Sequence, residues 1–213
     1  MKNYQNKYRS QTNRWAFWDY SASAAYYLTV VTKNKQMFFG KIIENEMQLS
    51  EIGLFLKQQL DNIPAMLGNI MLDTYVIMPD HFHCMLIISD DDFVQPMANY
   101  NGGDVVDTIH VDTIHELYLR GLRQSKLFTK NHHLHELSID DRIKQYKKMR
   151  RKMTIPLVMG KLKMQVSKQI NILNNTPGKT NWQHDYYDTI IRTTKDYINI
   201  RKYIVENPKK WKR

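Results

Sequence analysis

The chain has 213 residues, and its 42% hydrophobic content is too high for a globally disordered protein. No apolar run approaches the roughly 20 residues of a membrane span, and the N-terminus lacks a signal-like apolar segment, so we expect a cytoplasmic protein that does not act at a membrane. Its single cysteine, Cys84, excludes an internal disulfide framework and multi-cysteine zinc modules.

Charge narrows the class of partner. Lys and Arg total 31 against 21 Asp and Glu, which gives a net charge of +10. Such an excess favours a polyanion, because each neutralised phosphate releases counterions. The alternative is a solvated basic surface that serves solubility alone.

The first elements predicted from the N-terminus are strands around one helix. Residues 24–32 are rich in β-branched and aromatic side chains and predict a buried strand. Residues 36–42 predict a second strand, which residues 44–47 extend into a short ribbon. Ser50 is typical of a helix N-cap, and apolar residues at helical spacing follow it until Pro64 limits the helix.

A hairpin is expected next. Residues 72–78 and 83–89 each predict a strand, and Pro79 and Asp80 between them have turn chemistry. The two segments therefore predict an antiparallel pair of strands.

The middle of the chain differs in composition. The pentapeptide at 106–110 is repeated at once at 111–115, which indicates a tolerant region, and a basic run follows at 142–152. We interpret the chain as a single domain over 1–213 with an insertion or mobile subdomain at about 92–153. The basic run is typical of a solvated helix face, with contact to DNA as the alternative.

Regular structure returns near the C-terminus. Residues 155–173 predict an amphipathic helix that carries lysines, and residues 186–194 predict a short strand. A final helix over 194–206 is expected, with Thr193 and Asp196 as a capping box. Strands and helices without βαβα alternation predict an α+β sandwich, an antiparallel sheet with helices on one face.

The first candidate for chemistry is the sequence His81-Phe82-His83. Side chains alternate along a strand, so both imidazoles project from one face, while Phe82 and Cys84 enter the core. Two such histidines can hold one metal ion, and zinc is disfavoured because no cysteine joins them. The alternative is a pair of half-exposed polar residues.

The second candidate is Tyr203 with Asn207. Four residues apart on a helix, they share a face. A tyrosine hydroxyl can attack a metal-polarised phosphate, and an amide oxygen can join a hard-metal site. The alternative is simple packing, since Tyr197, Ile200 and Ile204 form an apolar stripe on the same helix.

Together these segments resemble the single-tyrosine transposases, in particular the REP-associated tyrosine transposases and their relatives. YVIMPDHFHCMLI resembles the family's HUH motif, and WQHDYYDTIIRTTKDYINIRKYIVENPKKW resembles its C-terminal block. The front end, WDYSASAAYYLTVVTKNKQMFFGKI with EMQLSEIG, is similar to its opening strands and first helix. The resemblance covers roughly 15–90 and 155–211.

The resemblance implies a role for each matching residue. His81 and His83 would bind Mg²⁺ or Mn²⁺, Asn207 would supply a further ligand, and Tyr203 would be the nucleophile. The implied fold is ferredoxin-like, with the HUH motif on a central strand. The implied reaction is nicking and rejoining of single-stranded DNA through a 5′-phosphotyrosine. The substrate would be a DNA hairpin or a palindromic element end.

Further residues are expected to contact DNA by base stacking or by charge. They are Arg14, Trp18, Trp182, Arg192, Lys202 and Lys209. Two other functions stay open. One is a module of the same fold that binds structured nucleic acid without cutting it. The other is a metal-dependent phosphodiesterase in which the histidines activate water and Tyr203 only packs. The sequence also leaves open whether the chain is a monomer or a homodimer, and whether Tyr203 acts within its own chain.

Overall fold

The computed structural model describes residues 17–89 and 113–211. Its main sheet has four strands in the order β4-β5-β1-β6, and every neighbouring pair is antiparallel. The strands are β1 (Ala24–Val31), β4 (Ile70–Met78), β5 (His81–Ile88) and β6 (Tyr187–Ile191). Among the described residues, no helix has the length and apolar character needed to cross a membrane.

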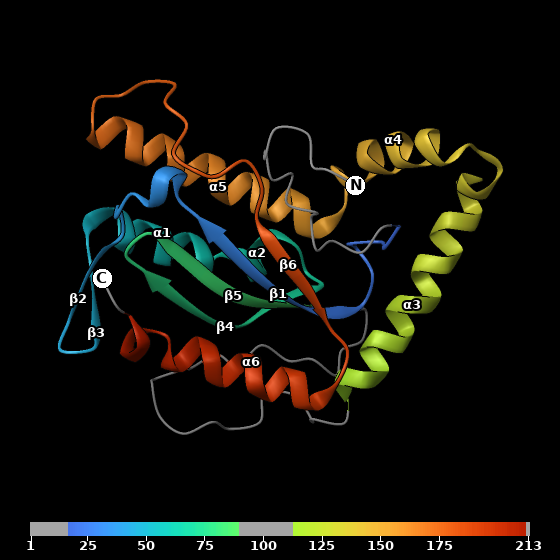
Figure 1. The fold of residues 1–213 in the computed structure, drawn as a ribbon, viewed down its shortest axis with the longest axis horizontal. Helices are drawn as coiled ribbons and strands as arrows, with labels where there is room; N and C mark the ends of the chain where they lie inside the picture. The colour runs from blue at the N-terminus through green and yellow to red at the C-terminus, as the bar shows by residue number, and fades with distance from the viewer. Residues whose placement is uncertain (1–16, 90–112, 212–213) are drawn as a thin grey trace, which may run out of the picture.

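The sheet and its two crossover helices form the ferredoxin-like arrangement that was expected. Helix α1 (Glu51–Asp61) lies between β1 and β4 in the chain, and α5 (Thr154–Leu173) lies between β5 and β6. The two helices contact each other on one face of the sheet (Figure 1). The β4–β5 hairpin turns at Pro79 and Asp80 as predicted, and β5 is an interior strand of the sheet.

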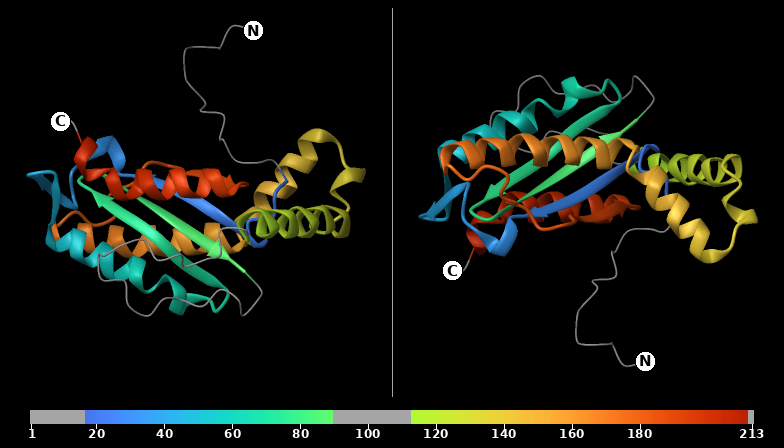
Figure 2. Two further views of the ribbon diagram at one scale, coloured as in Figure 1. Left: turned by 90° about the horizontal axis from the view of Figure 1, so that it is seen from below. Right: turned by 90° about the horizontal axis from the view of Figure 1, so that it is seen from above.

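Both faces of the sheet carry a helix, which corrects one detail of the expected fold. Helix α6 (Thr194–Glu206) covers the face opposite α1 and α5 (Figure 2). Alternation along the strands explains this: Met85 and Ile87 point away from α5, and they are buried with Ile204 of α6. The prediction of helices on one face therefore holds for the crossover helices and is wrong for α6.

The start of the two-stranded ribbon differs from prediction, whereas the start of α1 agrees with it. The ribbon of β2 (Gly40–Ile43) and β3 (Glu46–Leu49) begins later than residue 36, so the aromatic pair before it is not in a strand. Ser50 caps α1 as predicted by accepting a hydrogen bond from the Gly53 amide. The short helix α2 (Ile63–Met66) follows α1.

A helical hairpin precedes α5. It consists of α3 (Thr113–Asn131), the 3₁₀ turn η3 (Leu134–Glu136) and α4 (Ile139–Arg150), and it projects from the end of the sheet where β1 begins (Figures 1 and 2). The repeated pentapeptide lies mostly outside the described residues. The division of the chain into a domain and an insertion at about 92–153 stays a prediction.

Candidate functional site

The paired histidines project from β5 on the face that α6 covers. His81 and His83 pair with Val31 and Thr29 of β1, and their ring centroids are 4.8 Å apart. Phe82 between them is fully buried on the other face. The strand thus separates a core face from a site face, as its alternation predicted.

One ring nitrogen of each histidine is held by a neighbouring side chain. Nδ1 of His83 lies 2.8 Å from the Tyr27 hydroxyl and 2.8 Å from the Thr29 hydroxyl, both on β1. Nδ1 of His81 lies 2.6 Å from a carboxylate oxygen of Asp80. These contacts fix the ring orientations and leave Nε2 of each histidine as the nitrogen that could bind a metal.

Burial sets the protonation of His83 and of the Tyr27 hydroxyl beside it. Desolvation, with a smaller contribution from the neighbouring His81, lowers the pKa of His83 to about 3, so its ring is neutral at neutral pH. A neutral imidazole is the form that ligates a metal. Nε2 of His83 is buried and has no hydrogen-bond partner among the described residues. Burial also raises the pKa of Tyr27 to about 12, so that hydroxyl keeps its proton.

Tyr203 lies against the histidines. Its ring centroid is 5.4 Å from that of His83 and 6.5 Å from that of Tyr27, edge-on in both cases. The side chain is 44% exposed, whereas Tyr197 and Ile204 on the same helix are buried. The apolar stripe of α6 therefore packs without Tyr203, which argues against a purely structural role for this residue.

A buried polar cluster holds α6 in register on the sheet. The Tyr197 hydroxyl donates a hydrogen bond to Asp73 of β4 at 2.8 Å, and Arg201 donates to that hydroxyl at 3.3 Å. Arg201 also lies 3.8 Å from the Asp73 carboxylate. Because these contacts fix the rotation and the height of the helix, they determine where Tyr203 lies.

Asn207 follows Tyr203 by one turn and caps the C-terminal end of α6. It is 7% exposed, and the 3₁₀ turn η4 (Pro208–Lys210) follows it. Trp211, directly after η4, places its ring centroid 5.9 Å from that of His81. The C-terminal segment therefore returns to the histidines as well.

The residues present fit a divalent cation. The fit rests on the buried, unpaired Nε2 of His83 and on the carboxylate that orients His81. Within the described ranges, no group of three or more His, Cys, Asp or Glu side chains is arranged to hold a metal. The two imidazoles are thus the protein donors that the structure brings together, and so small a set suits an ion that also binds water and phosphate oxygens. A contribution of Asn207 to this site stays a prediction.

Two of the expected DNA contacts are wrong. Trp18 is 3% exposed and donates its ring N–H to the Tyr26 hydroxyl. Trp182 is 5% exposed, packs against Phe39 and Phe82, and donates to the carbonyl of Lys163. Both indoles are enclosed in the core, where no base can stack on them.

The charged candidates differ in where they lie. Lys202 and Lys209 are exposed on α6 and η4, near Tyr203 in the chain. Arg192 is exposed at the other end of α6, with its guanidinium 6.0 Å from the Tyr118 ring centroid of α3. Arg14 lies outside the described residues. Contact of these four residues with DNA stays a prediction.

Sequence reasoning from the residues missed the side chains that support the site. Tyr27 and Thr29 alternate along β1 as polar groups in an apolar strand, and that alternation was the available signal. Asp73 gave no signal, because its partners Tyr197 and Arg201 lie more than a hundred residues away in the chain.

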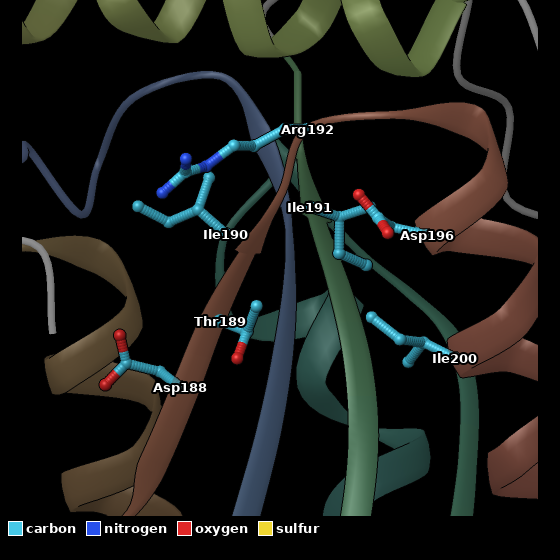
Figure 3. Close-up of a pocket in the computed structure, with 7 residues that line it drawn as sticks. All are labelled: Asp188, Thr189, Ile190, Ile191, Arg192, Asp196 and Ile200. Carbon is cyan, nitrogen blue, oxygen red and sulfur yellow. The ribbon is translucent and has the colours of Figure 1, made fainter. Parts of the chain in front are cut away.

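A cavity of about 350 Å³ lies along β6 beside the first turns of α6 (Figure 3). It is lined by strand residues and by the first turns of α6, and neither histidine nor Tyr203 lines it. The lining residues are Asp188, Thr189, Ile190, Ile191, Arg192, Asp196 and Ile200. The candidate metal site is therefore separate from this cavity.

Comparison with known proteins finds similar proteins but does not establish an activity for this chain. No protein-family model matches it. An uncharacterized protein of Haemophilus influenzae is 26% identical over 194 residues, which cover 91% of this chain and 85% of the relative. A solved structure of a REP-associated tyrosine transposase bound to a REP hairpin is 15% identical, with a TM-score of 0.42, over 99% of this chain and 74% of that chain. These values do not assign a family.

Proposed function

We propose that this protein nicks and rejoins single-stranded DNA, with Tyr203 as the nucleophile. One observation carries the proposal: the half-exposed Tyr203 ring lies 5.4 Å from His83, whose buried Nε2 has no partner among the described residues. An accessible hydroxyl beside a pair of imidazoles, of which that of His83 is buried and neutral, is an arrangement suited to metal-assisted phosphoryl transfer.

His81, His83 and Asn207 would hold the cation, with Asp80, Tyr27 and Thr29 keeping the two imidazoles in orientation. A bound Mg²⁺ or Mn²⁺ would polarise the scissile phosphate and offset the charge that develops in the transition state. The basic residues Lys202 and Lys209 would contact the DNA backbone near the cut.

The reaction is a transesterification. The Tyr203 oxygen forms a bond to phosphorus and releases its proton to solvent. The bond from phosphorus to the 3′ oxygen breaks, and that oxygen leaves as a 3′-hydroxyl after taking up a proton. The DNA is then joined to Tyr203 through its 5′ phosphate. Attack by a 3′-hydroxyl reverses these steps, so rejoining needs no external energy source.

The arrangement favours a site completed within one chain. Tyr203 reaches His83 of its own sheet, and the contacts of Tyr197 and Arg201 with Asp73 hold α6 there. The sequence resemblance to single-tyrosine transposases supports the same assignment of His81, His83, Tyr203 and Asn207. Hairpin DNA or a palindromic element end is the proposed substrate.

Covalent trapping tests the proposal. The full chain is incubated with Mn²⁺ and labelled hairpin DNA that carries single-stranded flanks, and the products are separated under denaturing conditions. We expect a protein–DNA adduct that disappears in Tyr203→Phe and in His81→Ala. Tyr187→Phe is the matched control, because Tyr187 is similarly exposed, at 53%, on the outer strand β6.

Each other outcome contradicts the proposal in a different way. Cleavage that survives Tyr203→Phe would favour water activated by the histidines. Tight binding with neither adduct nor cleavage on a broad panel of hairpins would favour a binding module. Loss of the adduct in Tyr187→Phe as well would show that the effect is not specific to Tyr203.

A further inference from the structure

The positive charge is concentrated in one part of the molecule. Residues 113–153 contain eleven Lys and Arg against four Asp and Glu, so they carry +7 of the chain's net +10. These residues form the hairpin of α3 and α4. It lies at the end of the sheet where β1 begins, while the histidines lie where β1 ends (Figure 1). Most of the net charge is therefore far from the candidate catalytic site.

On α4 the charges form a stripe that faces solvent. Lys144, Lys148 and Arg151 are exposed and recur at helical spacing. Tyr146, on the opposite side of the helix, is buried. Lys144 lies 3.7 Å from Asp141, which is a weak, exposed ion pair. The stripe thus keeps most of its charge available for a partner.

On α3 a second stripe has the same character. Arg123, Lys126 and Lys130 are exposed, while Gly121 and Ser125 on the other side of the helix are buried against the segment before β1. Each helix of the hairpin thus exposes a basic stripe, and such stripes suit a partner with regularly spaced negative charge.

This surface is firmly attached to the sheet. The Tyr146 hydroxyl donates to the carbonyl of Trp18 at 2.7 Å, and the Ser125 hydroxyl accepts from the Asp19 amide at 3.0 Å. The Gln124 side chain accepts from the Ser23 amide at 2.7 Å. The basic hairpin is therefore held at a fixed position relative to β1 and the histidines.

We infer that the basic α3–α4 hairpin binds the phosphate backbone of a duplex DNA arm whose single-stranded end enters the His81–Tyr203 site. This inference rests on the proposed function. Regularly spaced phosphates complement the stripes, and electrostatic contacts of this kind need no base sequence. A second copy of the chain is a poor occupant, because two hairpins of +7 repel each other.

The length of β1 sets the distance that a bound DNA must span between the α3–α4 hairpin and the histidines. Strand β1 has 8 residues, so its first and last Cα atoms are separated by one step fewer, which at about 3.3 Å per step spans roughly 23 Å. At about 3.4 Å per base pair, a duplex covers that distance in about 7 base pairs. Hairpin stems much shorter than this would occupy the catalytic end without reaching α4.

The test compares three DNAs in a binding assay that does not depend on cleavage. Affinity is measured in the Tyr203→Phe background over a series of salt concentrations. The first DNA has a stem of about 16 base pairs, more than twice the estimated reach, and a single-stranded flank. The second is an unpaired strand of the same total length, and the third has a stem of only about 4 base pairs.

The variant Lys144→Ala/Lys148→Ala/Arg151→Ala removes the α4 stripe. Its matched control, Lys161→Ala/Lys168→Ala/Lys179→Ala, removes the same charge from exposed positions on α5 and the following turn. Thermal unfolding of both variants verifies that the fold is intact.

We expect the α4 variant to bind the long-stem DNA at least about tenfold more weakly, with the slope of log K against log salt reduced by about 2 to 3. The loss should be much smaller for the unpaired strand and for stems of about 4 base pairs, and the control should change affinity less than about twofold. Equal losses for paired and unpaired DNA, equal losses in both variants, or no binding of stem DNA by the parent protein would each overturn the inference. The same two variants are also tested for binding to phosphatidylserine vesicles. If the α4 variant lost affinity for the vesicles and kept its affinity for stem DNA, the inference would be overturned and a membrane partner indicated. A missing adduct in the trapping assay would instead concern the proposed function alone.

Discussion

The two ends of the sheet carry different kinds of side chains, and these suit different tasks. At the end of β1 near His81 and His83, a few side chains are held by individual hydrogen bonds, and the buried ring of His83 is neutral. At the other end, the α3–α4 hairpin exposes many charges with few fixed partners. Chemistry at a phosphate depends on the orientation of two or three groups, whereas retention of a polyanion depends on the number of charges. Substitutions at one end should therefore leave the other end unaffected, and the largest effect is expected at the histidines.

Removing either histidine should affect catalysis without affecting retention. His83→Ala deletes the imidazole whose Nε2 faces the site, and we expect adduct formation to slow by more than about a thousandfold. Affinity for stem DNA should change less than about threefold, because the α3–α4 charges remain. Rates of adduct formation and binding curves measure the two effects, and chelation of divalent cations should reproduce the first. A parallel loss of binding would mean that the two ends are not separable.

A methyl group at Gly121 should disturb the other end. A Cβ there would overlap the carbonyl oxygen of Ser23 and lie 2.9 Å from the ring of Trp18. Because a backbone atom must move, we expect Gly121→Ala to lower the free energy of unfolding by about 2 to 3 kcal/mol. Urea denaturation measures it.

Gly160→Ala is the matched control, because nothing lies within 4 Å of a Cβ built at Gly160 in α5. Alanine in an open helix position should stabilise the protein by about 0.5 to 1 kcal/mol. Equal effects of the two substitutions would show that α3 is not packed closely against the segment before β1.

Tyr27→Phe should weaken the orientation of His83 and leave its side chain in place. The hydroxyl lies 2.8 Å from Nδ1, and Thr29 remains as a second contact. We expect about tenfold more Mn²⁺ to be required for half-maximal adduct formation. An unchanged Mn²⁺ requirement would contradict a role for Tyr27 in positioning the histidine. Full loss of activity that excess Mn²⁺ does not restore would contradict it as well.

The smallest predicted effect concerns pH and Asp73. Burial raises the pKa of this carboxyl, against the opposing effects of Arg201 and the Tyr197 hydrogen bond. A raised pKa in the folded state gives stability that is complete below the unfolded value and is lost as pH rises through the folded value. Relative to Asp73→Asn, the parent protein should therefore lose free energy of unfolding as pH rises from about 4 toward neutrality. Urea titrations across that range measure it, and parallel curves for the two proteins would refute it.

Much of the fold could be predicted because local signals agree with tertiary structure. The final helix was predicted over 194–206, and Thr193 caps it with Asp196 as expected. The turn at Pro79 and Asp80 and the β-branched runs on either side gave the hairpin. In these segments capping, turn chemistry and periodicity all favour the same structure.

The remainder depends on contacts between distant segments. Trp18 and Trp182 are aromatic residues beside basic ones in sequence, and only the packed core shows that both indoles are enclosed. Helix α6 packs on the second face because α1 and α5 already occupy the first. No local sequence pattern indicates which face a helix will cover. The contacts of Tyr27 with His83 require the register between β1 and β5.

That register makes the interior and the chemistry inseparable. Odd-numbered positions of β5 face α6, and even-numbered positions face α1 and α5. A slip of one residue would turn His81 and His83 into the apolar layer and bring Phe82 and Cys84 beneath Tyr203. The alternation of this strand cannot shift gradually, because any odd insertion in the tight turn at Pro79 and Asp80 would disrupt the packing and displace both histidines together. Loss of activity by that route would also be loss of the folded protein.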